Sequence, residues 1–353
     1  MILVNIYIKK AILFLVAAAL GYMLYINGVP IPYMLGGIIT AAVTRIFIDK
    51  SISWPKPMRE YALLAAGYGI GRNFTQATLT AVMAQGLGVL EACASGLGVS
   101  LIIAWVIARH SFTNLLSSVM GMLPGGLTVM MVMSEEDERC DANVVMVMQT
   151  LRMFSVVISV PFLAVYGLGA KVMADEHLAK TVAALDGYHW AIFFPLGMVA
   201  WYIAKTLHFP APRLVGPVFG AAIFSCFVHP VMPIPGPVMG FAQLLIGLVM
   251  GSQLDKDRLL NTYKLLPHIF IGSALLIVVS VAVAYHLSYM YGFSLITAFL
   301  AMAPGGIAEM CLAGMSMGED VSIILTYQLT RMIMICFLVP IGIKWWFSKH
   351  SVE

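Results

Sequence analysis

The sequence predicts an all-α polytopic membrane protein built from two inverted repeats, with about ten transmembrane helices and two re-entrant hairpins. Three observations support this fold class. The composition is strongly apolar, helix-breaking residues recur in register in the two halves of the chain, and lysine and arginine are distributed unevenly among the connecting segments. Together these observations indicate two copies of one membrane-spanning unit.

The composition indicates an integral membrane protein. Of the 353 residues, 61% are apolar and 10% are charged, against about 45–50% and about 25% in soluble domains. The net charge of +3 is small and the basic residues form no patch, so we expect no nucleic-acid partner. The five cysteines show no Cys-x-x-Cys spacing, and the eight histidines show no metal-ligand spacing. We therefore expect no disulfide framework, no metal, no cofactor and no enzymatic activity.

Helix breakers and membrane-depth charges occur twice at a nearly constant offset. Residues 30–37, Pro-Ile-Pro-Tyr-Met-Leu-Gly-Gly, match residues 210–217, Pro-Ala-Pro-Arg-Leu-Val-Gly-Pro, at an offset of 180. The same offset relates further glycines and a Pro-Gly-Gly motif, and after a single-residue gap an offset of 179 relates four more residues. These matches are Gly67 with Gly247, Gly71 with Gly251, Pro124-Gly125-Gly126 with Pro304-Gly305-Gly306, and Asp141, Gln149, Arg152 and Pro161 with Asp320, Gln328, Arg331 and Pro340. Paired broken elements are typical of a transporter's binding site.

The apolar stretches define the expected spans, because a hydrocarbon core of roughly 30 Å needs about 20 helical residues. We expect a first transmembrane repeat over residues 1–167, a polar linker over 168–187 and a second repeat over 188–353. The N-terminal stretch lacks a small-residue cleavage site, so we interpret it as a helix and not a signal peptide. The first repeat offers 11–27, 33–48, 60–73, 84–108, an interrupted stretch at 112–134, and 143–166. The second offers 188–204, 212–228, 238–252, 267–290, an interrupted stretch at 295–318, and 321–343.

The distribution of lysine and arginine favours inverted repeats, because these residues concentrate in cytoplasmic loops. If the interrupted stretches dip into the membrane without crossing it, only Arg72, Lys171 and Lys180 lie outside. The cytoplasmic side then holds Lys9, Lys10, Lys50, Lys56, Arg59, Arg109, Arg139, Lys205, Arg213, Lys256, Arg258, Lys264, Lys344 and Lys349. If the stretches cross, the asymmetry falls to ten against seven. Both termini are therefore expected to be cytoplasmic.

Each Pro-Gly-Gly motif should break a helix, because proline removes a backbone donor and glycine has low helix propensity. The arm at residues 112–123 would rise about 18 Å, roughly half the membrane. Free N–H groups of the helices beginning at Leu127 and Ile307 would face a cavity and favour an anion. We predict that a solute site is lined by Pro124, Gly125, Gly126, Pro304, Gly305 and Gly306. The alternative is a simple packing kink.

The last helix of each repeat places an arginine deep in the membrane. It begins with an Asp that suits an N-cap, and Arg152 or Arg331 follows eleven residues later, about 16 Å along the helix. A midplane arginine costs at least about 2.5–3.5 kcal/mol and must face the protein interior with a partner. Gln149 and Gln328 share the faces of these arginines. We predict that all four residues bind an anionic solute, with Arg as a carboxylate fork. The alternative is a structural role that locks the hairpins in place.

Glu309 breaks the symmetry of the two repeats, because its counterpart in the first is Val129. It lies three residues after Gly306 inside the second interrupted stretch. An acidic group at membrane depth could carry a coupling proton, bind a cation, or neutralise one of the two arginines. We predict that Glu309 is the coupling-ion position, and the role of a simple counter-charge is the alternative.

The paired motifs resemble a known family over nearly the whole chain. Two halves that each carry Pro-x-Pro-x-x-(Leu/Val)-Gly, then Pro-Gly-Gly, then Gln-x-x-Arg with a later Pro look like the duplicated bacterial AbrB membrane family, which is also labelled a regulator of gene expression or an ammonia monooxygenase. The resemblance implies a bacterial inner-membrane protein. Inverted repeats with re-entrant hairpins are also similar to the sodium/glutamate and citrate symporter families, a likeness of fold that transfers no substrate.

The sequence therefore predicts a secondary active transporter of a small organic anion, coupled to H+ or Na+, that works by alternating access in the inner membrane. Its partners would be the solute, the coupling ion and the lipid bilayer, and a homodimer is left open. One alternative is a membrane regulatory or sensor protein that affects gene expression without transport. A membrane oxygenase is a weaker alternative, because the sequence shows no His/Glu cluster for copper or iron.

Overall fold

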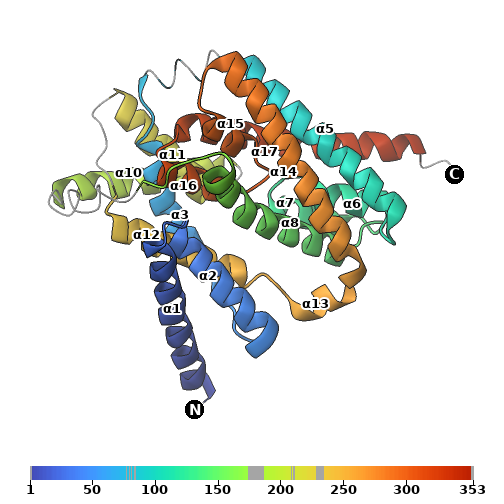
Figure 1. Cartoon of the computed structure of the whole chain (residues 1–353), viewed down its shortest axis with the longest axis horizontal. Coiled ribbons are helices and arrows are strands. Elements are labelled where there is room, and N and C mark those ends of the chain that lie inside the picture. Colours follow the sequence, from blue (N-terminus) through green and yellow to red (C-terminus); the bar gives the residue numbers. More distant parts are fainter. Residues whose placement is uncertain are drawn as a thin grey trace. The chain divides into compact units, whose positions relative to one another are not determined.

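The computed structural model describes residues 2–76, 78, 80, 82, 85–173, 187–207, 209, 211–227 and 234–350, and all regular structure in this part of the chain is helical (Figure 1). Fifteen α-helices are found there, with short π-helical and 3-10 segments. Five helical stretches are long and apolar enough to cross a membrane: Tyr7–Ile26, Gly86–His110, Ala142–Gly167, Tyr263–Tyr291 and Val321–Gly342. The chain is therefore a multi-pass membrane protein.

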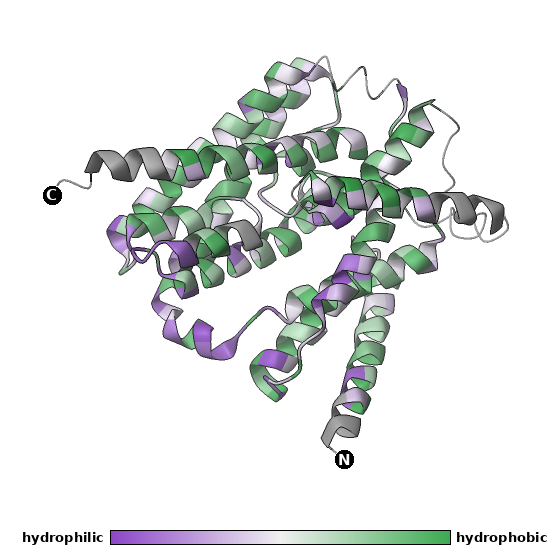
Figure 2. Cartoon of the chain, turned by 180° about the vertical axis from the view of Figure 1, so that it is seen from behind, coloured by the Kyte–Doolittle hydropathy of each residue, from purple (hydrophilic) through white to green (hydrophobic). Residues whose placement is uncertain are grey.

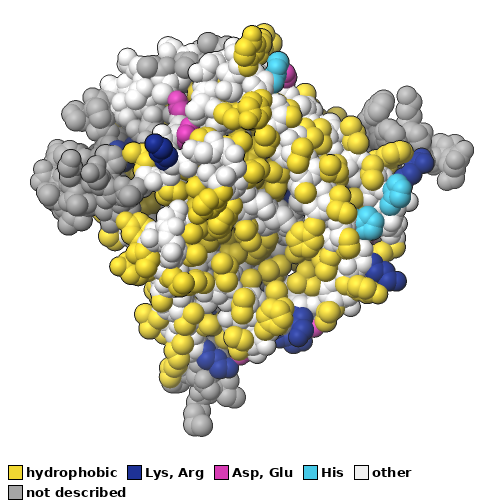
Figure 3. Space-filling view, in the orientation of Figure 1, with side chains coloured by type: hydrophobic (Ala, Val, Ile, Leu, Met, Phe, Trp, Pro, Cys, Tyr) yellow, Lys and Arg dark blue, Asp and Glu magenta, His cyan; other side chains and the backbone are white. Residues whose placement is uncertain are grey.

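Large apolar side chains cover much of the outside of the helices. Tyr289 is 89% exposed, Leu87 is 80% exposed and Phe47 is 76% exposed. Figure 2 shows hydrophobic residues on most helices and a polar segment at α13, Lys256–Asn261. Hydrophobic side chains also spread over most of the face seen in Figure 3. Such a surface suits lipid, because soluble monomers rarely expose contiguous apolar patches larger than a few hundred Å².

The chain forms two compact units, and each takes segments from both halves of the sequence. The first unit comprises Met1–Met83, Pro161–Asp257 and Cys311–Ser322. The second unit comprises Ala84–Val160, Arg258–Met310 and Ile323–Glu353.

The first unit packs its helices through backbone contacts at glycines. A Cβ atom at Gly247 would overlap the main-chain oxygen of Met34, and one at Gly67 would overlap that of Leu214. These two contacts join corresponding positions, because the repeat offset relates Met34 to Leu214 and Gly67 to Gly247. The helices of this unit are α1 (Ile2–Ile26), α2 (Pro32–Val43), continued by a π-helix (Thr44–Ile48), α3 (Lys56–Gly71), α10 (Gly187–Thr206), α11 (Pro212–Phe227) and α12 (Gly236–Gly251).

The helices α2 and α11 begin in the same unusual way. Ile31 has a φ of 46° and Ala211 a φ of 49°, both in the left-handed region. Each residue stands immediately before the first proline of its helix, Pro32 or Pro212. This backbone conformation costs about 1–3 kcal/mol for a residue other than glycine. The fully buried side chain of Ile31 shows that packing holds the first of these turns, and Pro32 and Pro212 are each the first residue of their helix.

The second unit is built around two long helices and two broken stretches. Helices α5 (Gly86–His110) and α14 (Leu266–Tyr291) lie side by side (Figure 1). The first broken stretch consists of α6 (Leu115–Met122) and α7 (Leu127–Glu136), and the second consists of α15 (Leu295–Met302) and α16 (Ile307–Met317). Of α16, the residues from Cys311 onward belong to the first unit. They are followed by α8 (Ala142–Phe162) and α17 (Val321–His350). We call residues 123–126 the first break and residues 303–306 the second break.

The observed helices agree in position with the predicted stretches, with two differences. Five helices are long and apolar enough to cross a membrane, and the predicted ten crossings stay a prediction. Both interrupted stretches break at Pro-Gly-Gly, as predicted. The predicted N-caps are also confirmed: Asp141 Oδ1 accepts a hydrogen bond from the backbone N–H of Asn143 at 2.9 Å, and Asp320 Oδ1 accepts one from Ser322 at 3.0 Å. The short helix α13 was not predicted, and most of the predicted linker at 168–187 lies outside the described residues. The division into repeats at 1–167 and 188–353 stays a prediction.

Candidate functional site

The first break is held by a glutamine from α8. Gln149 Nε2 donates hydrogen bonds to the main-chain oxygens of Met120 at 2.6 Å and Leu123 at 2.9 Å. The last carbonyls of a helix have no donor partner within that helix, so the side chain of Gln149 closes the C-terminus of α6. Its Oε1 accepts a hydrogen bond from Arg152 Nη2 at 2.7 Å. The amide is thereby fixed in one orientation.

The second break is held by the corresponding glutamine from α17. Gln328 Nε2 donates to the main-chain oxygens of Leu300 at 2.8 Å and Ala303 at 3.0 Å. Arg331 adds hydrogen bonds from Nη1 to Met302 O at 2.9 Å and from Nη2 to Ala303 O at 3.0 Å, and its Nη2 also contacts Gln328 Oε1. In this conformation both glutamines donate their side-chain N–H groups to main-chain oxygens. Their predicted role as donors to a solute stays a prediction.

The two arginines are used differently, although both are buried, with 4% of each side chain exposed. Arg331 binds the break that precedes its own helix. Arg152 instead donates from Nη1 to Pro304 O in the second break, at 2.6 Å. Both guanidinium groups therefore converge on residues 302–304. Convergence of two positive groups on one segment of backbone carbonyls concentrates the positive charge of the site at the second break.

The Nε donor of each guanidinium group remains unused. Arg152 Nε and Arg331 Nε are buried and have no hydrogen-bond partner within the described part of the chain. A buried unsatisfied donor costs about 1–3 kcal/mol. An acceptor that reached either Nε atom would therefore gain a strong hydrogen bond, and a carboxylate is the acceptor that fits a guanidinium edge best.

Glu309 lies in the first turn of α16 and is 1% exposed. Its carboxylate lies against Gly306, because a Cβ atom at Gly306 would overlap Glu309 Oε2. Within the described residues, the buried charged side chains are Arg152, Arg331 and Glu309. All three belong to the second unit. This part of the protein therefore contains two guanidinium groups and one carboxyl group away from water.

The glycines of the breaks provide space. A Cβ atom at Gly125 would lie 2.7 Å from the Cε atom of Met130 and 2.8 Å from a side-chain carbon of Ile335. One at Gly305 would lie 2.8 Å from the Cε atom of Met310. Gly126 has a φ of −62°, which any residue adopts. These motifs therefore need glycine for close packing rather than for left-handed backbone.

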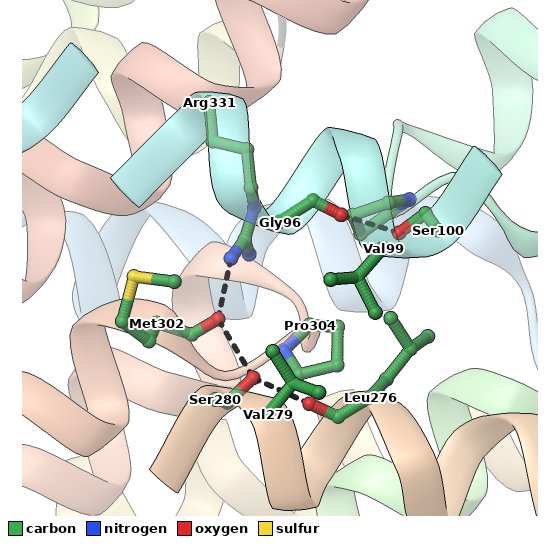
Figure 4. Close-up of a pocket in the computed structure, with 10 residues that line it drawn as sticks. Gly96, Val99, Ser100, Leu276, Val279, Ser280, Met302, Pro304 and Arg331 are labelled. Carbon is green, nitrogen blue, oxygen red and sulfur yellow. Dashed lines mark hydrogen bonds between the residues drawn. The ribbon is translucent and has the colours of Figure 1, made fainter. Parts of the chain in front are cut away.

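A small pocket joins both breaks to the long helices α5 and α14 (Figure 4). Its volume of about 10 Å³ is room for about one water molecule, so an organic anion would need the walls to separate. Pro304 lies between the two helices, and Met302 O accepts hydrogen bonds from Arg331 and from Ser280 Oγ at 3.4 Å. The lining residues are Gly96, Val99, Ser100, Pro124, Leu276, Val279, Ser280, Met302, Pro304 and Arg331.

The contribution of α5 and α14 to this pocket was not predicted from the sequence. A signal was present, because the repeat offset that relates the two Pro-Gly-Gly motifs also relates Val99-Ser100 to Val279-Ser280. These positions stand in unbroken apolar helices with no ionisable group beside them, so nothing local marked them. Of the predicted site residues, Pro124, Pro304 and Arg331 line the pocket. Arg152, on α8, donates a hydrogen bond to Pro304 O, and the two glutamines donate hydrogen bonds to main-chain oxygens at the breaks.

Known proteins resemble this chain over most of its length. Residues 33–347 match the model of a family described as "Transition state regulatory protein AbrB". The "Uncharacterized protein YhjN" of Bacillus subtilis (strain 168) is 26% identical over 351 residues, which cover 92% of this chain and 90% of that protein. The "Putative regulator AbrB" of Escherichia coli (strain K12) is 24% identical over 323 residues, 88% of each chain. The chain belongs to the AbrB family of membrane proteins.

Proposed function

We propose that this protein is a secondary active transporter of a small organic anion in the bacterial inner membrane, coupled to H+ or Na+. The observation that carries the proposal is the pair of buried arginines, Arg152 and Arg331, whose guanidinium groups converge on the second break of a membrane helix. Charged groups at membrane depth mark solute and ion pathways. Broken helices at such a site supply backbone groups that can exchange partners.

The hydrogen bonds of the arginines suggest how an anion would bind. The Nη groups of the two arginines donate hydrogen bonds to the main-chain oxygens of Met302, Ala303 and Pro304. A carboxylate carries a full charge and is a stronger acceptor than a carbonyl oxygen. It would compete for these donors and engage the unused Nε atoms, and so stabilise a conformation in which the second break has moved away. Differential affinity of this kind is what a ligand needs to shift a conformational equilibrium.

Equivalent contacts in the two halves of the sequence support a duplicated unit. The contacts of Gln149 with Met120 and Leu123 correspond to those of Gln328 with Leu300 and Ala303. We infer two inverted repeats, two re-entrant hairpins and cytoplasmic termini, an arrangement in which alternating access can exchange two similar states. Cysteines placed at Lys205 and Lys256 should then react with an impermeant reagent from the cytoplasm, and reaction only from the periplasm would contradict inversion.

All predicted site residues lie in the second unit. This supports a mechanism in which that unit carries the bound anion as one body. Glu309, the buried acid beside the second break, is the group proposed to bind the coupling proton or cation.

The direct test is uptake of labelled small carboxylates by vesicles that contain the purified protein, with an imposed H+ or Na+ gradient. The proposal expects accumulation of at least one carboxylate above its external concentration, and none in vesicles without protein. Absence of accumulation and of exchange for every carboxylate, by protein that remains folded, would overturn it.

A regulatory role is the second candidate, because the family and the relative from Escherichia coli are described as regulators. A transporter can alter gene expression indirectly by changing the concentration of a solute. The two roles separate in a variant that folds but does not transport. An effect on expression that survives in that variant would favour regulation without transport.

A further inference from the structure

The two walls of the pocket are made by corresponding residues of α5 and α14. Under the repeat offset, Gly96, Val99 and Ser100 on α5 correspond to Leu276, Val279 and Ser280 on α14. The valine and serine positions are identical. The walls therefore differ at one position, where α5 has glycine and α14 has leucine.

This difference opens one side of the pocket. A Cβ atom added at Gly96 would meet no atom within 4 Å. On the opposite wall, the side chain of Leu276 is 3% exposed and fills the corresponding place (Figure 4). The α5 wall therefore has unfilled space at Gly96, and the corresponding position of the α14 wall carries a leucine side chain.

Two polar side chains with unused hydrogen-bonding atoms line the pocket on its open side. Ser100 Oγ donates to Gly96 O at 2.7 Å and is fully buried, so its lone pairs can accept a hydrogen bond. Arg331 lines the same pocket, is 4% exposed, and its Nε has no hydrogen-bond partner in the described part of the chain. The unpaired Nε donor of Arg331 and the acceptor of Ser100 suit a carboxylate with a short neighbouring chain or hydroxyl group.

The buried charges set the sign of the ligand's charge, and the open side limits its size. The buried charged side chains among the described residues are two arginines and one glutamate, so the site favours an anion whether or not Glu309 holds a coupling ion. The unfilled place at Gly96 corresponds to one leucine side chain on the other wall, which suits a single short carboxylate better than a dicarboxylate.

We propose that the α5 side of the pocket, at Gly96 and between Ser100 and Arg331, is the subsite for a short-chain monocarboxylate, and that Leu276 excludes the ligand from the equivalent place on α14. This inference rests on the proposed transport of an organic anion and assigns the substrate class and its position. The ligand takes the space that a side chain occupies in the other half of the sequence.

Gly96→Ala tests the subsite because it should occupy the ligand's space without harming the protein. The added methyl meets no atom, and alanine has the higher helix propensity. Gly98→Ala is the matched control: it changes the same residue type on the same helix, also into open space, and Gly98 does not line the pocket. The full-length purified variants are titrated with acetate, glycolate, lactate, succinate and chloride while the thermal unfolding midpoint is recorded.

The proposal expects wild type and Gly98→Ala to bind a monocarboxylate equally well, with succinate and chloride at least tenfold weaker. Gly96→Ala should unfold at or above the wild-type temperature without ligand and bind the monocarboxylate at least tenfold more weakly. Equal affinity of Gly96→Ala and Gly98→Ala, or preference of the wild type for succinate, overturns the subsite and leaves anion transport standing. Failure of the wild type to bind or transport any carboxylate removes both proposals.

Discussion

Arg152 donates a 2.6 Å hydrogen bond from Nη1 to the main-chain oxygen of Pro304, a residue 152 positions further along the chain. This bond joins the helix that follows the first broken stretch to the second break. The equivalent arginine, Arg331, binds the break next to its own helix through Met302 and Ala303. The site is therefore asymmetric even though the residues that build it are paired.

The two arginines should respond differently to replacement by lysine. Arg331→Lys loses hydrogen bonds to two backbone carbonyls and to Gln328, because an ammonium group cannot reproduce the planar fork. Arg152→Lys loses fewer contacts. We expect Arg331→Lys to lower the thermal unfolding midpoint clearly more than Arg152→Lys does. Parallel melting curves of the two purified variants measure this, and equal losses would contradict the asymmetry.

The glutamines should matter more for folding than for solute recognition. Gln328→Ala removes the hydrogen bonds of Leu300 O and of one Arg331 N–H, at about 1–3 kcal/mol for each unsatisfied group. Ala303 O keeps its bond from Arg331. We expect a loss of several kcal/mol in stability for this variant and for Gln149→Ala, measured by denaturant or thermal unfolding in detergent. A variant with normal stability but abolished anion binding would instead place the amide in direct contact with the solute.

Glu309→Gln tests the coupling position, because the amide keeps the shape of the side chain and removes its charge. The variant should still exchange the anion across the membrane but should fail to accumulate it against a gradient. Vesicles with an imposed pH or sodium gradient measure accumulation, and preloaded vesicles measure exchange. If Glu309 served only to neutralise an arginine, the variant would misfold or lose binding. Wild-type accumulation would remove Glu309 from the coupling mechanism.

The Asp49 carboxyl should make the stability of the folded protein depend on pH in the acidic range. Hydrogen bonds from Ser51, followed by the bond from Lys9, lower the pKa of the Asp49 carboxyl to about 2. A group with a depressed pKa contributes stability above its unfolded pKa of about 3.9 and loses it as the pH falls through the folded value. The midpoint difference between wild type and Asp49→Asn should therefore be small but present at neutral pH and vanish near pH 2. A difference that grows on acidification would contradict the assignment. The contribution of Asp49 to stability stays small because its ion pair with Lys9 is exposed to solvent.

Local features of the sequence predicted the fold better than they predicted the contacts of the site. Proline and glycine act on their own helix, so both breaks were predictable, as were the aspartate caps. Burial of Arg152 followed from its depth in an apolar helix. Its acceptor did not, since Pro304 becomes a neighbour only through packing of distant segments. Gly96 was missed for the same reason: a glycine in a long apolar helix carries no local sign of the space beside it.

Transport depends most directly on whether the buried guanidinium groups hold the anion. The decisive measurement is counterflow of a labelled monocarboxylate into preloaded vesicles by wild type and by Arg152→Lys, compared at equal amounts of folded protein. We predict counterflow by the wild type and a reduction of about tenfold or more in Arg152→Lys, in line with the roughly 1.5–3 kcal/mol of a hydrogen bond to a charged group. Counterflow at the wild-type rate by Arg152→Lys would contradict the account.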